Sequence, residues 1–329
     1  MEVISIKLEE IAKLGKTSVS TVSRVLNNKP GVGKKKREII EKLLIENGFY
    51  NKVYKISQDA KRIALVIPDL KNPFFGEIVK KVTQIGKKKD YEILIFDTDE
   101  NYENEIDITN SIVKGNILGV IMCVVGGELS KNNIKKLQDF SIPFVLFDRE
   151  LDFYNDGIFL DDFKAGFLGT ELLIKEGYKN IGILVGNLKY KNMENRLRGY
   201  KGALEKYNLN INENYIYEIG LEIKDGYEVG RKIFSEDNKL EGLFSCSNLI
   251  TLGLIKYQKE YGEKIPLVAF DNPDYFDILD LNITCVTRSV SEIGEQAINI
   301  LLRKIDKNTK NSQKIIITPK IILKGSEKR

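Results

Sequence analysis

A segment near the N-terminus gathers side chains that could contact nucleic acid. Residues 17–28 read Thr-Ser-Val-Ser-Thr-Val-Ser-Arg-Val-Leu-Asn-Asn. Four apolar residues recur at helical spacing and predict a short helix with one buried face: Val19, Val22, Val25 and Leu26. The opposite face would carry the polar residues Ser20, Thr21, Ser23, Arg24 and Asn27. A guanidinium surrounded by small hydroxyl and amide groups suits contacts with phosphates and base edges.

A second group of polar side chains follows apolar runs further along the chain. Three carboxylates come just after such runs: Asp69, Asp148 and Asp271. Ligands of open parallel sheets bind beyond the carboxyl ends of the strands, so we expect these carboxylates to line one crevice. Arg196 lies near the start of a predicted helix that can face this crevice. Carboxylates together with one planar guanidinium suit a sugar or a similar polyol.

Several nearby residues have a simpler interpretation beside the functional one. Phe74 and Phe75 either provide an apolar wall for the crevice or belong to the core, and we expect at least one to be core. Asp161 and Asp162 are as readily helix caps as ligand-binding groups. Arg198 is expected to be a solvated helix residue.

The composition argues against catalysis and metal binding. The 329 residues include no histidine, which removes the most common general base and a principal zinc ligand. Three cysteines, Cys123, Cys246 and Cys285, lie far apart in apolar surroundings and are expected to be reduced core residues. No nucleophile–base pair has a defensible arrangement. We predict no catalytic residue, no metal site and no cofactor.

The N-terminal part is basic, whereas the remainder is slightly acidic. Residues 1–62 hold 14 Lys/Arg against 7 Asp/Glu, and the rest of the chain holds 37 against 40. This asymmetry indicates a polyanionic partner for the N-terminal part alone. A helix near 6–14, ended by Gly15, and one near 34–47 flank the hydroxyl-rich segment, as in a helix-turn-helix. The inward residues of the later helix are predicted to be Ile39, Ile40, Leu43 and Leu44.

From Arg62 onward, short apolar runs alternate with helical patterns. Runs lie at 63–67, 91–96, 119–125 and 144–147, and then at 158–160, 181–185, 215–217, 242–245 and 267–270. Such alternation predicts open parallel sheets with helices on both faces. A helix over 292–304 and a single strand over 314–323 are predicted to come last.

The N-terminal motif resembles that of a known family. Residues 8–27, Leu-Glu-Glu-Ile-Ala-Lys-Leu-Gly-Lys-Thr-Ser-Val-Ser-Thr-Val-Ser-Arg-Val-Leu-Asn, are similar to the DNA-binding signature of the lactose-repressor (LacI/GalR) family of bacterial transcription regulators. Residues 68–75, Pro-Asp-Leu-Lys-Asn-Pro-Phe-Phe, are close to that family's Pro-Asp-x-x-Asn-Pro-Phe-Phe. Arg196, three residues before Gly199, and the Phe-Asp-Asn of 270–272 also resemble family motifs. The resemblance covers essentially the whole chain.

This resemblance implies roles for individual residues. In the recognition helix, Arg24, Val19 and Ser20 would read bases while neighbouring groups hold phosphates. The implied DNA-binding residues are Thr17, Ser18, Val19, Ser20, Thr21, Arg24, Asn27 and, in the linker, Ile56 as a minor-groove wedge. The implied effector-binding residues are Asp69, Phe74, Phe75, Asp148, Arg196 and Asp271. Leu221 stands where many members have an aromatic platform, so we expect a weak ligand held by hydrogen bonds.

The resemblance also implies an architecture of three parts. Residues 1–48 would form the helix-turn-helix domain, 49–61 a hinge, and 62–329 an effector-binding and dimerisation core like the periplasmic binding proteins. Lobe one of the core would be about 62–160 plus 290–315, and lobe two about 161–288. Both lobes would be doubly wound parallel sheets.

We therefore predict a cytoplasmic DNA-binding transcription regulator, by resemblance a repressor. It would act as a homodimer on a near-palindromic double-stranded operator, controlled by a small ligand such as a sugar. No membrane is involved, because no run approaches a transmembrane length and the N-terminus lacks a secretion signal. A solute-binding protein would have such a signal and no basic helix-turn-helix. An enzyme on a doubly wound sheet would have a glycine-rich fingerprint, which 63–75 lacks.

Overall fold

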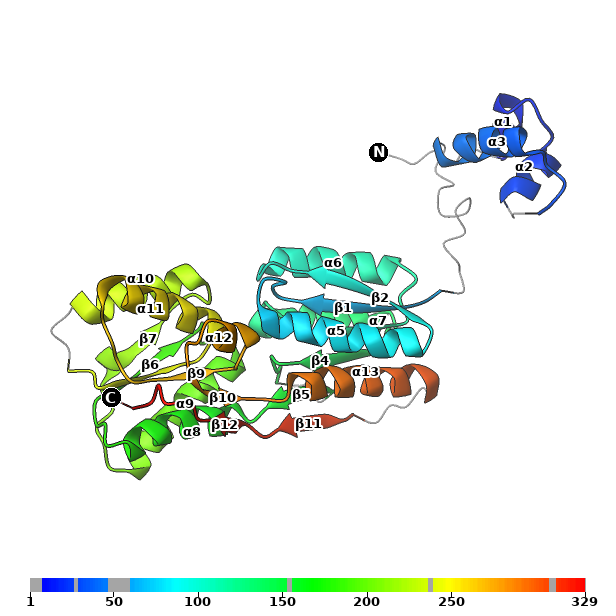
Figure 1. Ribbon diagram of the computed structural model, residues 1–329. Helices are drawn as coiled ribbons and strands as arrows, with labels where there is room; N and C mark the ends of the chain where they lie inside the picture. The colour runs from blue at the N-terminus through cyan, green and yellow to red at the C-terminus, as the bar shows by residue number, and fades with distance from the viewer. Residues whose placement is uncertain are drawn as a thin grey trace. The chain divides into compact units, whose positions relative to one another are not determined.

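The computed structural model describes residues 8–26, 29–46, 60–152, 156–235, 239–307 and 312–328. The chain divides into two compact units, residues 1–60 and 61–329 (Figure 1). The second unit contains two α/β lobes, each built on its own sheet.

In its described residues, the N-terminal unit has three helices around a small apolar core. These are α1 (Leu8–Leu14), α2 (Val19–Leu26) and α3 (Lys34–Glu46). Its fully buried side chains are Ile11, Ala12, Val22, Val25, Ile40 and Leu44. The prediction that Ile39 faces inward is wrong, because its side chain is 57% exposed. The helical period of α3 places Ile40 and Leu44 on the buried face and turns Ile39 outward.

The turn between α1 and α2 differs from the predicted glycine cap. Gly15 does end α1, since its backbone N–H bonds to the carbonyl of Ile11 at 2.8 Å. However, the residue in the left-handed conformation is Lys16, with φ of 44°. The left-handed position is therefore filled by a side chain that disfavours it.

Lobe one has a six-stranded parallel sheet in the order β11-β5-β4-β3-β1-β2. Its strands are β1 (Lys61–Ile67), β2 (Tyr91–Asp97), β3 (Gly119–Met122), β4 (Phe144–Phe147), β5 (Gly157–Leu160) and β11 (Lys314–Ile317). Its helices are α5 (Pro73–Lys88), α6 (Tyr102–Lys114), α7 (Lys131–Asp139) and α13 (Val290–Lys307), with a 3-10 turn η1 (Gly127–Ser130).

Lobe two repeats this plan in the order β12-β10-β9-β8-β6-β7. Its strands are β6 (Ile181–Val185), β7 (Ile216–Glu218), β8 (Gly242–Ser245), β9 (Leu267–Phe270), β10 (Thr284–Thr287) and β12 (Lys320–Ile322). Its helices are α8 (Asp162–Lys175), α9 (Lys191–Lys206), α10 (Ile223–Ser235), α11 (Asn248–Tyr261) and α12 (Asp274–Ile278), with a 3-10 turn η2 (Glu213–Tyr215). Only β12 runs antiparallel to its neighbour among the strand pairs described. The predicted fold of two doubly wound, mainly parallel sheets is confirmed.

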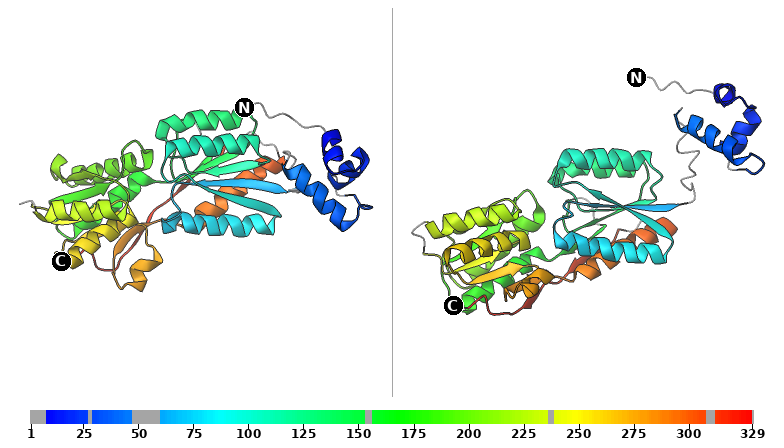
Figure 2. Two further views of the ribbon diagram at one scale, coloured as in Figure 1. Left: turned by 90° about the horizontal axis from the view of Figure 1, so that it is seen from above. Right: turned by 45° about the horizontal axis from the view of Figure 1, so that its top comes forward.

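Helices cover both faces of the sheets (Figures 1 and 2), and alternate strand residues pack against opposite helical layers. In β1, Ile63 and Leu65 pack toward α5 and α13, whereas Ala64 and Val66 pack toward α6 and α7. In lobe two the corresponding layers are α8 with α9 and α10 with α11. Strands buried on both faces explain why their sequences are continuous apolar runs.

The chain crosses between the lobes three times, after β5, after β10 and after β11. The prediction of one strand over 314–323 is wrong, because β11 completes the sheet of lobe one and β12 joins that of lobe two. Pro319 lies between them, and proline cannot donate to a strand ladder. The C-terminal segment thus belongs to both lobes.

Helices α8 and α9 approach unusually closely. A Cβ atom placed on Gly166 would lie 2.0 Å from the backbone oxygen of Arg196, and one on Gly199 would lie 2.1 Å from that of Phe163. Real Cβ atoms do not approach backbone so closely, so only glycine fits these two positions. This contact fixes the helix that carries Arg196.

Candidate functional site

Helix α2 presents a polar surface opposite its buried valines. Val22 and Val25 are buried against α1 and α3, whereas Ser20 and Arg24 are exposed. Val19 is 42% exposed and so belongs to the outward surface, not to the buried face where helical spacing placed it. This outward arrangement is what a helix entering a major groove requires.

The start of α2 is held by a hydroxyl cap. Ser18 Oγ accepts a hydrogen bond from the backbone N–H of Thr21 at 3.2 Å and lies 2.8 Å from the hydroxyls of Ser20 and Thr21. The predicted DNA-binding residues Thr17, Ser18, Val19, Ser20, Thr21 and Arg24 thus cluster at this helix. Asn27 and Ile56 lie outside the described residues.

The predicted effector-binding residues line one cleft between the two lobes. The cleft encloses about 490 Å³, a volume suited to a small ligand. Its lining includes all six of them: Asp69, Phe74, Phe75, Asp148, Arg196 and Asp271. The expectation that ligands bind beyond the carboxyl ends of parallel strands thus identified residues of one cleft that are as much as 202 positions apart in the chain.

Arg196 is buried and already holds two partners. Its Nε donates to Asp162 Oδ1 at 2.8 Å, and its Nη1 donates to the carbonyl of Cys246 at 2.8 Å. Its guanidinium lies over the ring of Phe270, 3.5 Å from the centroid. Nη2 has no hydrogen-bond partner in the described part of the chain. Arg196 can thus offer a ligand one free nitrogen, not the open two-nitrogen fork expected from the sequence.

Asp162 is the buried counterion of Arg196. Burial raises its pKa to about 6, although the charge of Arg196 acts in the opposite direction. Asp161, in contrast, is a helix cap, since its Oδ1 accepts from the backbone N–H of Lys164 at 3.0 Å. The cap interpretation thus holds for Asp161, whereas Asp162 does not line the cleft and can act on a ligand only through Arg196. Arg198 is exposed and bonds to Asn195, as expected for a solvated residue.

Asp148 and Asp271 occupy equivalent places in the two lobes. Asp148 follows β4 and Asp271 follows β9, and each has φ of 62°. Each donates its backbone N–H to the next strand, at Ile158 and Val286 respectively. Left-handed aspartates at both strand ends are strained positions of the kind found at binding sites.

Sequence reasoning missed Arg288, which joins these two aspartates. Its Nε and Nη2 donate to the two oxygens of Asp271 at 3.2 Å each, and its Nη1 pairs with Asp148. Burial raises the pKa of Asp148, but the charges of Arg288 and Arg196 outweigh it and hold that pKa below its usual value. Arg288 directly follows β10. A search for polar residues just after each predicted strand would have found it if the short strand 284–287 had been recognised.

The rest of the cleft wall comes from both lobes. Arg149 donates to Glu100 at 2.8 Å and stacks on the ring of Tyr190, 4.0 Å from its centroid. Tyr190, at the start of α9, donates its hydroxyl across the cleft to the carbonyl of Val125 at 2.8 Å. Burial, reinforced by Asp97 and Glu100, raises the pKa of Asp69.

Phe74 and Phe75 satisfy both of their proposed roles. Each is 4% exposed and belongs to the apolar core of lobe one, and both line the cleft. Asn72 caps their helix by accepting from the backbone N–H of Phe74 at 3.1 Å. Across the cleft, Asn248 donates to Asn72 at 3.3 Å, while its own Oδ1 has no partner among the residues described. Among the described residues, the cleft wall thus includes a buried donor, Arg196 Nη2, and a buried acceptor, Asn248 Oδ1, that have no partner.

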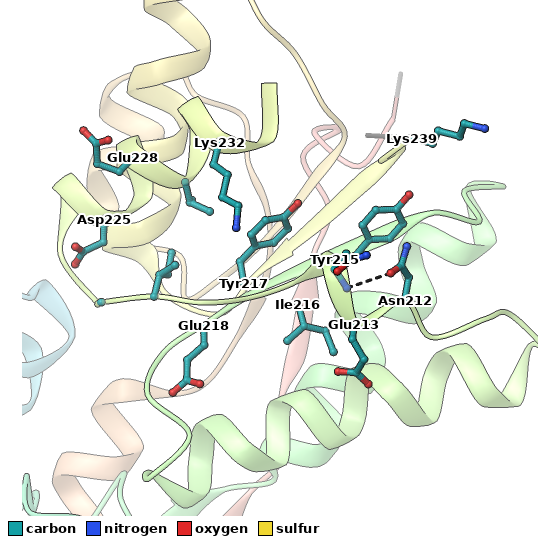
Figure 3. Close-up of a pocket in the computed structure, with 14 residues that line it drawn as sticks. Asn212, Glu213, Tyr215, Ile216, Tyr217, Glu218, Asp225, Glu228, Lys232 and Lys239 are labelled. Carbon is teal, nitrogen blue, oxygen red and sulfur yellow. Dashed lines mark hydrogen bonds between the residues drawn. The ribbon is translucent and has the colours of Figure 1, made fainter. Parts of the chain in front are cut away.

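A second, more open hollow runs along the edge strand β7 (Figure 3). Its side chains include Glu218, Glu228 and Lys232, with Lys232 lying 5.5 Å from the ring centroid of Tyr217. Asn212 at one end accepts from a backbone N–H of its own turn. None of the predicted effector-binding residues lines this hollow.

The sequence as a whole matches two family descriptions. Residues 60–326 match periplasmic binding proteins and the sugar binding domain of the LacI family, and residues 7–51 match bacterial regulatory proteins of the lacI family. The chain belongs to the LacI family. The resemblance seen in residues 8–27 is thereby confirmed.

Relatives of this LacI-family chain match it over almost its full length. The HTH-type transcriptional repressor PurR of Histophilus somni (strain 129Pt) is 28% identical and covers 98% of each chain. The NTD biosynthesis operon regulator NtdR of Bacillus subtilis (strain 168) is 29% identical over 97% of this chain and 99% of its own. A solved structure of the transcriptional regulator CelR in complex with cellobiose has a TM-score of 0.74 at 18% identity, over 98% of this chain and 99% of that one, and shares the fold.

Within the described ranges of this LacI-family chain, no helix has both the length and the apolarity needed to span a bilayer.

Proposed function

We propose that this LacI-family protein is a cytoplasmic transcriptional repressor, controlled by an uncharged polyol such as a sugar in its cleft. The free donor of Arg196 and the free acceptor of Asn248 support the effector half. Both are buried polar atoms, and leaving such atoms unpaired is costly unless a ligand pairs with them. A hydroxyl group supplies a donor and an acceptor without bringing a charge into the cleft.

The effector proposal is tested by a thermal-shift screen of the full chain against sugars, polyols, sugar phosphates and nucleosides. A ligand that binds only the folded state raises the melting temperature by mass action. A sugar or polyol that raises it supports the proposal. A response confined to sugar phosphates or nucleosides contradicts it.

The DNA-binding half rests on the exposed surface of α2. We propose that Arg24, Val19 and Ser20 read bases, and that Thr17, Ser18 and Asn27 contact phosphates. We further propose that Thr21 takes part in DNA binding and that Ile56 enters the minor groove. A homodimer would place two such helices on a near-palindromic operator. Such a dimer could bury apolar side chains that are exposed on the unit formed by residues 61–329, namely Leu70, Ile95, Ile278 and Leu279.

Arg24→Ala should weaken binding to the cognate operator by roughly 1–3 kcal/mol while affecting random DNA little. The reason is that arginine reads guanine by paired hydrogen bonds that a phosphate contact does not require. Fluorescence anisotropy with both DNAs measures the difference. Lys36→Ala, which removes an equal charge from an exposed position of α3, is the control. An equal loss on both DNAs would reduce Arg24 to a phosphate contact.

Effector affinity should fall as the pH is lowered through about 6, because burial raises the pKa of Asp162 to about 6 and this carboxylate becomes protonated there. Arg196 then loses the carboxylate that orients it. The stability effect has the opposite sign: because the pKa is raised in the folded state, the penalty of burying this carboxylate is relieved as the pH falls. Calorimetry across this range measures the affinity, and Asp162→Asn should flatten its pH dependence. A pH profile unchanged by Asp162→Asn would show that another group is responsible.

A further inference from the structure

Arg288 ties the two lobes together at the floor of the cleft. In lobe two it forms a two-nitrogen contact with Asp271, and in lobe one its Nη1 pairs with Asp148. Its guanidinium also lies over the ring of Phe74 of lobe one, 3.8 Å from the centroid. Only 9% of Arg288 is exposed, so these contacts are shielded from water.

Without Arg288, two buried carboxylates would lose the one cation that contacts both of them. Asp148 is 6% exposed and Asp271 is 8% exposed. Buried carboxylates that share a site demand a cation, and here the chain supplies it from its own crossover segment. The remaining guanidinium groups of the cleft are also paired, Arg196 with Asp162 and Arg149 with Glu100.

We propose that Arg288 determines the specificity of the cleft, because it acts as an internal cation in the place where an amine-bearing ligand would bind. The inference rests on the proposed polyol function and deepens it. With Arg288 present, the carboxylates that an ammonium group of a ligand would contact are already paired with a cation. The ammonium would lose its hydration on binding without gaining an unpaired carboxylate in return. A hydroxyl carries no charge and therefore loses less hydration than an ammonium. It can pair with Arg196 Nη2 and with Asp148 Oδ2, whose contact with Asn192 is long, at 3.4 Å.

The first test compares wild type with Arg288→Gln, using neutral hexoses and their 2-amino derivatives as matched pairs. Glutamine retains hydrogen-bonding capacity but removes the positive charge that pairs with Asp148 and Asp271. In wild type the neutral sugar of a responding pair should give the larger thermal shift. In Arg288→Gln the amino sugar should give the larger shift, with the affinity ratio changed about tenfold or more. The same order of preference in both proteins would overturn the proposal.

A second test does not depend on any sugar. Arg288→Ala removes the guanidinium and leaves a vacancy beside two carboxylates, into which methylguanidinium should bind. About 10 mM methylguanidinium should therefore raise the melting temperature of Arg288→Ala. It should not raise that of wild type or of Arg198→Ala, in which an exposed arginine of α9 is lost. Tetramethylammonium at equal ionic strength, a cation without N–H donors, should have no such effect.

An equal response of all three proteins to methylguanidinium, or no response of Arg288→Ala, contradicts the proposal. If Arg288→Ala does not remain folded, it is refolded with and without the ion. Recovery that depends on methylguanidinium supports the inference, and recovery that does not contradicts it. Failure of every sugar in the first test together with methylguanidinium rescue in the second would reject the polyol effector but leave the role of Arg288 intact.

Discussion

Arg196→Ala should weaken the response to effector and also lower the melting temperature. The substitution leaves the buried carboxylate of Asp162 without its counterion and the carbonyl of Cys246 without its donor. Breaking a buried ion pair by removing one partner costs roughly 3–5 kcal/mol, which corresponds to a fall in melting temperature on the order of 10 °C for a unit of this size. The lost Nη2 donor should reduce affinity for the effector by roughly 1–3 kcal/mol.

Arg198→Ala is the matched control for this experiment. Arg198 lies on the same helix, two residues further on, and its guanidinium is exposed. Its loss should change stability by no more than about 0.5 kcal/mol and leave the effector response intact. Operator binding without effector should survive in both variants, since the DNA-binding helices belong to a separate unit. Wild-type stability and affinity in Arg196→Ala would remove this residue from the site.

Gly166→Ala should destabilise the protein and weaken effector binding, although Gly166 does not line the cleft. The added methyl would lie 2.0 Å from the backbone oxygen of Arg196, so α8 and α9 must separate. Overpacking of this kind costs roughly 1–3 kcal/mol. Because the atom displaced belongs to Arg196 itself, the guanidinium must move with it. Denaturant unfolding and calorimetry measure the two effects.

Gly76→Ala provides a control of opposite sign. Gly76 lies inside α5, and a Cβ atom there would meet nothing within 4 Å. Alanine in an unobstructed helix interior stabilises by roughly 0.5–1 kcal/mol relative to glycine. If both substitutions shifted stability in the same direction, the packing argument for Gly166 would be wrong.

The sequence predicted the order of strands and helices because strands buried on both faces are continuous apolar runs. Leu267–Phe270, for example, matches β9 residue for residue. Strand β10 went unrecognised because Thr-Cys-Val-Thr is half hydroxyl and only four residues long. That omission concealed Arg288, since the search for polar groups began at strand ends.

The same rule placed Asp148 and Asp271 in the cleft but not their partner. Asp148 and Asp271 could be placed because each directly follows a strand of a parallel sheet. Their pairing with Arg288 depends on how the two sheets meet, and no local sequence pattern encodes that arrangement. The free nitrogen of Arg196 could not be predicted for the same reason, since it depends on which neighbouring aspartate pairs with this arginine. Asp161 caps the helix and Asp162 pairs with Arg196, and the two residues differ only in the direction of their side chains. Which of two neighbouring aspartates faces inward is decided by tertiary packing.

The three crossings between the lobes have a consequence for synthesis of the chain. Translation completes the DNA-binding helices first, but lobe one must wait for α13 and β11, which come after all of α8 to β10. Until then β5 is an open edge that can pair wrongly with another nascent chain. A premature stop codon just before residue 314 would delete one strand from each sheet, so a late truncation of the gene damages both lobes at once.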